Sequence, residues 1–216
     1  MPRPLLLGHR GARALKSIPE NTVASFDQAL ADGCDGFEFD VRLTEDGAAV
    51  ICHDAGSGKF RIERSTARQL TTLPLLRDVL MRYQDQAFLD IELKVRDLER
   101  TVFDLFLRFK PRRGCVVSSF IPGALKALHD QDATISLGLI CETRTQLRLW
   151  TELPITHVIP HHALVDVDLV RKVKGAGRKL FVWTVNDPVD MHRFAEWGVD
   201  GIISDDTKLL CKTLAA

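Results

Sequence analysis

The chain has 216 residues, a length at which α/β barrels of roughly 200 to 250 residues form one domain, so we expect a single domain over residues 1–216. Its 29 basic and 29 acidic side chains cancel, so we expect neither nucleic acid nor an anionic membrane as a stable partner. The apolar run at residues 5–7 is too short for a secretory leader or a membrane span, and the five dispersed cysteines indicate reduced thiols in a cytoplasmic protein.

The chain begins with a predicted strand–helix–strand unit. Residues 5–7 form a short apolar strand that runs into Gly8-His9-Arg10-Gly11, where the glycines predict a tight turn that can approach a ligand closely. Pro19-Glu20-Asn21-Thr22 predicts the start of a helix, and Gly33 predicts its end. The next strand begins at Gly36, so polar residues gather where the strands end.

Residues 36–54 are the most informative stretch. Strand alternation places Glu38 and Asp40 on one side and apolar residues on the other. Asp46-Gly47 predicts a hairpin turn, and residues 49–52 return the chain so that His53 lies near the two acids. A histidine beside two carboxylates suits a metal site or an acid/base site. The alternative is a half-buried hairpin whose acids face water.

Residues 55–73 contain few apolar side chains and predict a loop or small cap. Helical periodicity returns over residues 75–83. The strand over residues 87–95 then places Asp90, Glu92 and Lys94 on one side, which brings a third carboxylate toward the first two. An amphipathic helix is predicted over residues 97–110.

Strands and helices alternate through the rest of the chain. Further strands are predicted at residues 115–118, 135–140, 157–160, 179–185 and 201–204, with helices near 122–131, 143–151, 166–176 and 187–196. Eight parallel strands, each followed by a helix, predict a (β/α)8 TIM barrel with a hairpin and cap excursion after the second strand. A doubly wound open sheet is the alternative, although the glycines after the first strand do not form G-x-G-x-x-G.

In such a barrel the active face is the ring of strand carboxyl ends. Three carboxylates there form an oxygen-rich site suited to Mg²⁺ or Ca²⁺. Two cations, Arg10 and Lys94, favour an anionic substrate whose charge grows in the transition state, which points to phosphate. Two histidines, His9 and His53, would supply a proton acceptor and a proton donor.

These motifs together resemble those of the glycerophosphodiester phosphodiesterase family. The matching segments are His9-Arg10-Gly11, Pro19-Glu20-Asn21-Thr22, Glu38-Phe39-Asp40-Val41, Thr44-Glu45-Asp46-Gly47, His53-Asp54, Ile91-Glu92-Leu93-Lys94 and Trp183-Thr184-Val185-Asn186. The resemblance implies metal-dependent hydrolysis of a small glycerophosphodiester to glycerol 3-phosphate and an alcohol. The implied roles are metal binding for Glu38, Asp40 and Glu92, acid/base chemistry for His9 and His53, phosphate binding for Arg10 and Lys94, a substrate pocket formed by Trp183 and Phe120, and support from Glu20, Asn21 and Asp54.

The chain departs from the family in the segment after His53-Asp54, because a longer insertion is usual there and only residues 55–73 are present. Lysophospholipase D or phospholipase C-like activity on lipids is one alternative function, and a metal-binding barrel without activity is another. His161-His162 follows the sixth strand, and we expect this pair to be solvent-exposed rather than functional. The sequence leaves open which histidine is the acid, which head group is preferred and whether a cyclic phosphate forms.

Overall fold

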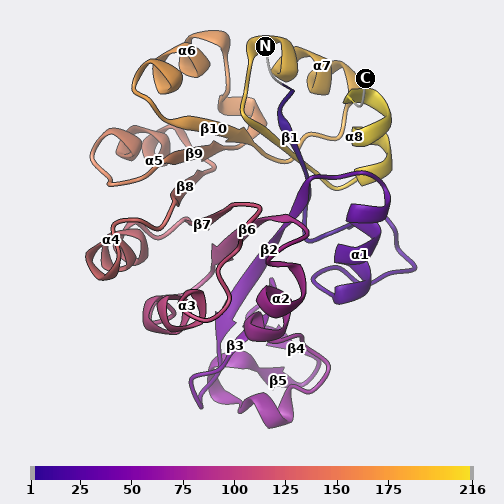
Figure 1. The fold of residues 1–216 in the computed structure, drawn as a ribbon, viewed down its shortest axis with the longest axis vertical. Helices are drawn as coiled ribbons and strands as arrows, with labels where there is room; N and C mark the ends of the chain where they lie inside the picture. Colours follow the sequence, from indigo (N-terminus) through magenta and orange to yellow (C-terminus); the bar gives the residue numbers. More distant parts are fainter. Residues whose placement is uncertain (1–2, 215–216) are drawn as a thin grey trace.

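The structure is a computed structural model that describes residues 3–214, and over these residues eight parallel strands close into a barrel (Figure 1). The strands, in barrel order, are β1 (Leu5–Gly8), β2 (Gly36–Leu43), β6 (Phe88–Leu93), β7 (Cys115–Ser119), β8 (Leu137–Cys141), β9 (His157–Pro160), β10 (Lys179–Val182) and β11 (Gly201–Ser204). Strand β1 closes the barrel because it pairs with β11, from Leu5 opposite Gly201, and also with β2, where Leu7 lies opposite Gly36. The predicted (β/α)8 architecture is confirmed.

Helices connect the strands and surround them (Figure 1). They are α1 (Val23–Ala31), α2 (Leu76–Tyr83), α3 (Glu99–Phe106), α4 (Pro122–Gln131), α5 (Arg144–Arg148), α6 (Val167–Gly175), α7 (Pro188–Trp197) and α8 (Thr207–Leu214). Helix α7 shows how local sequence sets these bounds. The side chain of Asp187 accepts hydrogen bonds from the backbone N–H groups of Val189 and Asp190, and Gly198, with φ 79°, ends the helix in the left-handed region.

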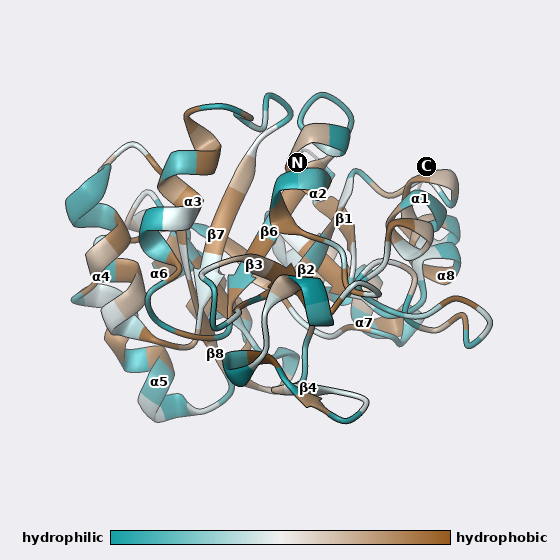
Figure 2. Ribbon diagram, turned by 90° about the horizontal axis from the view of Figure 1, so that it is seen from below, coloured by the Kyte–Doolittle hydropathy of each residue, from teal (hydrophilic) through white to brown (hydrophobic). Residues whose placement is uncertain are grey.

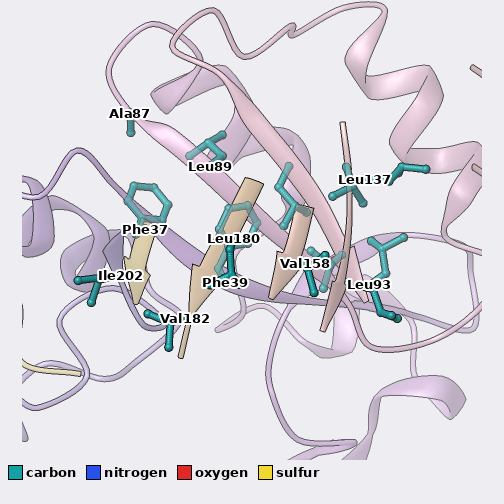
Figure 3. Packing of buried hydrophobic residues seen from close by; sticks show 14 of the residues in the cluster. Phe37, Phe39, Ala87, Leu89, Leu93, Leu137, Val158, Leu180, Val182 and Ile202 are labelled. Atoms are coloured by element: carbon teal, nitrogen blue, oxygen red, sulfur yellow. The ribbon is translucent and has the colours of Figure 1, made fainter. Parts of the chain in front are cut away.

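The alternation of each strand separates two apolar layers. Between strands and helices lie Phe37 and Phe39 of β2 (Figure 3). They pack around Phe26 of α1, whose ring stacks on Phe37 with centroids 4.3 Å apart. A second, smaller cluster contains buried residues of other strands, including Leu7, Val116, Ile140, Ile159, Phe181 and Ile203. Hydrophobic colour is accordingly concentrated on strands such as β6 and β7, whereas the helices carry hydrophilic patches as well (Figure 2). Because Phe37, Phe39 and Val41 face the helices, the acids that alternate with them, Glu38 and Asp40, face the barrel interior.

The excursion after β2 is a hairpin followed by a small cap. Strand β3 (Ala49–Ile51) runs antiparallel to β2, with Ile51 opposite Val41. The cap contains a two-stranded sheet, β4 (Gly56–Ser57) and β5 (Phe60–Arg61), and two short 3₁₀ turns, η1 (Ile62–Arg64) and η2 (Ala67–Gln69). The cap packs on the hairpin through two of its few apolar side chains, because Ile62 and Leu70 are buried against Val50 of β3.

Several predicted boundaries are wrong by a few residues. Helix α1 begins at Val23 rather than Pro19, because Asn21 has φ 58° and Thr22 is extended and caps the helix. The helix predicted over residues 97–110 is confined to Glu99–Phe106, and Asp97 before it has φ 69°. The helix predicted over 143–151 is α5 followed by the 3₁₀ turn η3 (Leu149–Thr151), and the strand predicted over 179–185 ends at Val182.

Within residues 3–214, none of the helices has both the length and the apolar composition that a membrane span requires.

Candidate active site

A cavity of about 260 Å³ opens at the carboxyl ends of the strands. One side is polar and contains both predicted histidines and both predicted cations, and the other is largely apolar. The lining residues are His9, Arg10, Glu38, His53, Asp90, Glu92, Lys94, Phe120, Ile140, Glu142, Ile159, Trp183 and Ile203. The barrel therefore brings together side chains that the sequence spreads over nearly its whole length.

Three buried carboxylates lie close together, and two of them, Glu38 and Glu92, line the cavity. Glu38 and Asp40 project from β2 and Glu92 from β6, and the strand register places Asp40 directly opposite Glu92. One oxygen of each carboxylate lies within 4.8 Å of the others, and Oε1 of Glu38 is buried without a hydrogen-bond partner. An all-oxygen donor set with an unsatisfied buried carboxylate oxygen fits a hard divalent cation.

The protonation of these acids reflects burial and their mutual repulsion. Burial, together with the charges of Asp40 and Glu92, raises the pKa of Glu38 well above its usual value. Burial and Asp40 likewise raise the pKa of Glu92 to about 7. Burial would raise the pKa of Asp40 as well, but Lys94 and Arg10 outweigh it and hold that pKa below its usual value. Without a cation, the cluster therefore retains protons near neutral pH.

Both predicted cations lie against the carboxylates. Lys94 Nζ is 2.8 Å from an oxygen of Glu92 and 3.2 Å from one of Asp40. Arg10 Nε is 3.3 Å from Asp40, and its Nη1 donates to Glu20 at 2.7 Å. Each cationic side chain contacts a carboxylate and also lines the cavity, where it can bind an anionic ligand.

Glu20 and Asn21 lie behind these groups, in the turn before α1. Asn21 Nδ2 donates to Asp40 Oδ2 at 2.8 Å, and the backbone N–H of Asp40 points back to Asn21 Oδ1 at 3.3 Å. The same turn is tied to the first strand, since Asn21 N donates to the carbonyl of Arg10 at 3.0 Å. The positive φ of Asn21 thus positions an amide that orients one of the carboxylates.

His9 is fixed by a residue from the other end of the chain. Its Nδ1 lies 2.7 Å from Oδ1 of Asp205, which follows β11. Arg13 Nη1 at 3.1 Å and Asn186 Nδ2 at 2.8 Å also donate to Asp205. Although burial opposes it, these donors hold the pKa of Asp205 well below its usual value. With Nδ1 engaged, Nε2 of His9 is directed toward Glu38, whose Oε2 is 3.8 Å away.

His53 sits in a more open setting on the hairpin. Its Nδ1 is 2.8 Å from Asp54 Oδ1, and Arg42 donates to its backbone carbonyl at 2.7 and 2.9 Å. Burial lowers the pKa of His53 and outweighs the opposing effects of Asp40 and Asp54. The two histidines therefore have different environments, one held by a network of several side chains and the other by a single exposed aspartate.

An aromatic wall forms the opposite side of the cavity. The rings of Phe120 and Trp183 meet edge to face with centroids 5.7 Å apart, and Trp183 Nε1 donates to the carbonyl of Ile159. His161 also packs edge-on against Trp183, and Nδ1 of His162 lies 2.8 Å from the Thr184 carbonyl. The histidine pair is half-buried rather than solvent-exposed as expected, and its contacts support the wall.

Five polar residues of the site received no role in the sequence analysis: Arg13, Asp90, Glu142, Asn186 and Asp205. Asp90 lines the cavity, accepts a hydrogen bond from Ser118 Oγ at 2.5 Å, and has a pKa raised to about 7 by burial. The sequence contained one signal for Asp205, because this residue directly follows the last strand, as His9 directly follows the first. No sequence signal indicated that Asp205 contacts His9, since the two residues lie 196 positions apart.

Comparison with known proteins places these features in a family. The Glycerophosphoryl diester phosphodiesterase family profile matches residues 9–104 and 81–209. A glycerophosphodiester phosphodiesterase of Caldanaerobacter subterraneus subsp. tengcongensis is 29% identical over 236 aligned residues, which cover 96% of each chain. A phosphodiesterase of Oleispira antarctica, solved with the product sn-glycerol-3-phosphate, is 25% identical with a TM-score of 0.86, covering 99% of this chain and 98% of that one. A chain from Silicibacter pomeroyi DSS-3 shares the fold with a TM-score of 0.90 at 21% identity, covering 100% of this chain and 94% of that one.

Proposed function

Because the chain belongs to the Glycerophosphoryl diester phosphodiesterase family, we propose that it hydrolyses glycerophosphodiesters to glycerol 3-phosphate and an alcohol, using a divalent cation and a histidine pair. The observation that carries this proposal is that one cavity is lined by both histidines, both cations and two acids of the carboxylate cluster, Glu38 and Glu92. The product bound to the Oleispira antarctica relative supports the choice of substrate.

Glu38, Asp40 and Glu92 would hold the cation, Mg²⁺ or Ca²⁺. When bound, the ion supplies Lewis-acid activation and a template for the substrate. Arg10 and Lys94 would contact phosphoryl oxygens, because each reaches the cavity and is already oriented by the carboxylates behind it. Cations held in place before the reaction stabilise developing negative charge without reorganising.

His9 and His53 would transfer the two protons that hydrolysis requires, one from the nucleophile and one to the departing alkoxide. The nucleophile is either water or the 2-hydroxyl of the substrate's glycerol. Asp205 would keep His9 in a single ring orientation, with Nε2 toward the cavity. Asp54 would act on His53 in the same way, from an exposed position.

The size of the cavity favours a compact substrate. A volume of about 260 Å³ lies below the roughly 300 to 1,000 Å³ typical of pockets for drug-sized ligands. The aromatic wall of Phe120 and Trp183 would contact the glycerol part, while the alcohol part would extend outward. This geometry favours glycerophosphodiesters over lipids that retain an acyl chain.

The direct test is release of glycerol 3-phosphate from glycerophosphocholine, glycerophosphoethanolamine and glycerophosphoglycerol, with Mg²⁺, with Ca²⁺ and with chelator. We expect turnover that requires a cation. The matched control is the same assay on lysophosphatidylcholine, which retains an acyl chain. A chain that binds the cation but cleaves none of these substrates would be a non-catalytic barrel, and one that prefers the lysolipid would be a lysophospholipase D.

A further inference from the structure

Two buried cysteines meet behind the seam at which the barrel closes. Cys34, between α1 and β2, and Cys211, in α8, have their Sγ atoms 3.6 Å apart although they are 177 positions apart in the chain. Their exposed fractions are only 7% and 5%. Neither residue belongs to the candidate active site.

The local structure holds these thiols against each other by more than one contact. One turn earlier in α8, Thr207 Oγ1 donates to Asp32 Oδ2 at 2.5 Å. Residues four apart on a helix share a face, so Thr207 and Cys211 both meet the segment after α1. Gly33, between Asp32 and Cys34, has φ 103°, and a Cβ built there would lie 3.7 Å from Cys211 Sγ. The loop therefore lies directly on this face of α8.

The pair spans the strand pairing that closes the barrel. Strand β1 is paired with β2 at two positions, Leu7 with Gly36 and Gly8 with Phe37. Cys34 lies two residues before β2. Helix α8, which carries Cys211, packs on β1 and follows β11. A covalent bond between these cysteines would link the element after β11 to the segment before β2, across β1.

We propose that Cys34 and Cys211 are a reversible thiol–disulfide site that locks the closing seam of the barrel when the protein meets a low-molecular-weight disulfide. One cysteine thiolate attacks a sulfur of the reagent, forming a mixed disulfide and releasing one reagent thiol. The second cysteine thiolate attacks the protein sulfur of that mixed disulfide and releases the second thiol. The protein thus loses two electrons and two protons, and the reagent disulfide is reduced to two thiols.

The bond would stabilise the fold strongly because it would close a ring from residue 34 to residue 211. Crosslinks that close long loops remove the most conformational freedom from the unfolded chain. For a protein of this length, we expect the unfolding temperature of the oxidised form to exceed that of the reduced form by about 5 °C or more. The other cysteines in the described residues, Cys52, Cys115 and Cys141, have no sulfur partner.

The test is oxidation of the intact protein with oxidised glutathione, followed by alkylation of free thiols, proteolysis and mass spectrometry. We expect a peptide pair joined through Cys34 and Cys211, a mass loss of two hydrogens, and an unfolding temperature that dithiothreitol returns to its original value. Cys211→Ser should abolish the linked pair and the temperature shift, whereas Cys52→Ser, at a half-buried position outside the pair, should keep both.

Mapping the disulfide in the wild-type protein tests the proposal even if a variant folds poorly. Free thiols at both positions after prolonged oxidation, or a bond to another cysteine, would overturn the proposal. A Cys34–Cys211 bond that leaves the unfolding temperature unchanged would overturn its locking role. None of these measurements uses hydrolysis of a phosphodiester, so they stand apart from the proposed activity.

Discussion

Nδ1 of His9 lies 2.7 Å from Oδ1 of Asp205, so the first polar residue after the first strand is oriented by the first acid after the last strand. The contact exists only because β1 pairs with β11 and closes the barrel. It gives one histidine of the proposed pair a half-buried carboxylate partner, whereas the other relies on the exposed Asp54.

Asp205→Asn should lower turnover by about 10- to 100-fold, the range typical of a residue that orients a functional side chain. The amide retains the size of the carboxylate but lacks the charge that attracts His9 and Arg13. The measurement is kcat for glycerophosphocholine across pH, in which a change in the pH profile would report on His9. Asp206→Asn is the control, because this neighbour caps α8 by accepting from Leu209 N and makes no contact with His9. Equal effects of the two substitutions would contradict the role of Asp205.

Glu92→Gln should leave the fold intact, weaken cation binding, and lower activity by more than about a hundredfold. Since burial raises the pKa of Glu92 to about 7, the cation must displace a proton near neutral pH, so binding should weaken as the pH falls from 8 to 6. Isothermal titration with Mg²⁺ and Ca²⁺ at both pH values checks this. Glu45→Gln, an exposed acid on the hairpin turn, is the control. Unchanged turnover in the presence of chelator would contradict the metal site.

His9→Ala and His53→Ala should each lower turnover on glycerophosphodiesters by about a hundredfold or more, the usual scale of a positioned proton-transfer group. A glycerophosphodiester with a p-nitrophenol leaving group separates their roles, because that leaving group needs no proton. The variant that retains its rate on this substrate has lost the general acid. His192→Ala, on the exposed face of α7, is the control. Normal activity of both site variants would exclude the assignment.

We expect the protein to discriminate only weakly between glycerophosphodiesters with different alcohol head groups. None of residues 55–73, all of which the structure describes, lines the cavity, so the cap builds no pocket around the alcohol. Even a buried methylene contributes only about 1 to 3 kcal/mol of discrimination, and exposed contacts contribute less. We expect kcat/KM for choline, ethanolamine and glycerol head groups to agree within about tenfold, with bis(p-nitrophenyl) phosphate, which lacks glycerol, much poorer. A preference of several hundredfold would show that the cap or a second chain closes over the site.

Acid should destabilise the protein through His157, which lies far from the carboxylate cluster in sequence. Burial lowers the pKa of His157 to about 3, and its Nε2 has no hydrogen-bond partner. The unfolded chain therefore binds a proton near pH 6.5, whereas the folded chain binds it only near pH 3. The free energy of unfolding thus falls as the pH drops from 6.5 toward 3, by about 5 kcal/mol in all.

His157→Gln should reduce this slope, measured as the free energy of unfolding in urea between pH 7 and pH 4. The comparison is His192→Gln, which makes the same substitution at an exposed position. A slope that is the same in wild type and His157→Gln would show that other groups govern acid sensitivity.

Much of the site could be predicted from sequence because its signals are local. The alternation in β2 and β6 fixes which side chains face the barrel interior, and the polar residues at strand ends follow the general placement of barrel active sites. Glu38, Asp40 and Glu92 therefore lie together as expected. The cap was also predicted, since a short segment poor in apolar residues cannot form a further layer of the barrel.

The tertiary structure decided the contacts between residues distant in sequence. The pairing of β1 with β11 and β2 brings Asp205 to His9 and Cys211 to Cys34, and no periodicity within either segment encodes those partners. The start of α1 also depended on tertiary contacts, because Asn21 adopts a positive φ in a turn tied to Arg10 and Asp40. Sequence patterns report which face of an element is buried, whereas partners across the barrel are set by closure and register, which involve the whole chain at once.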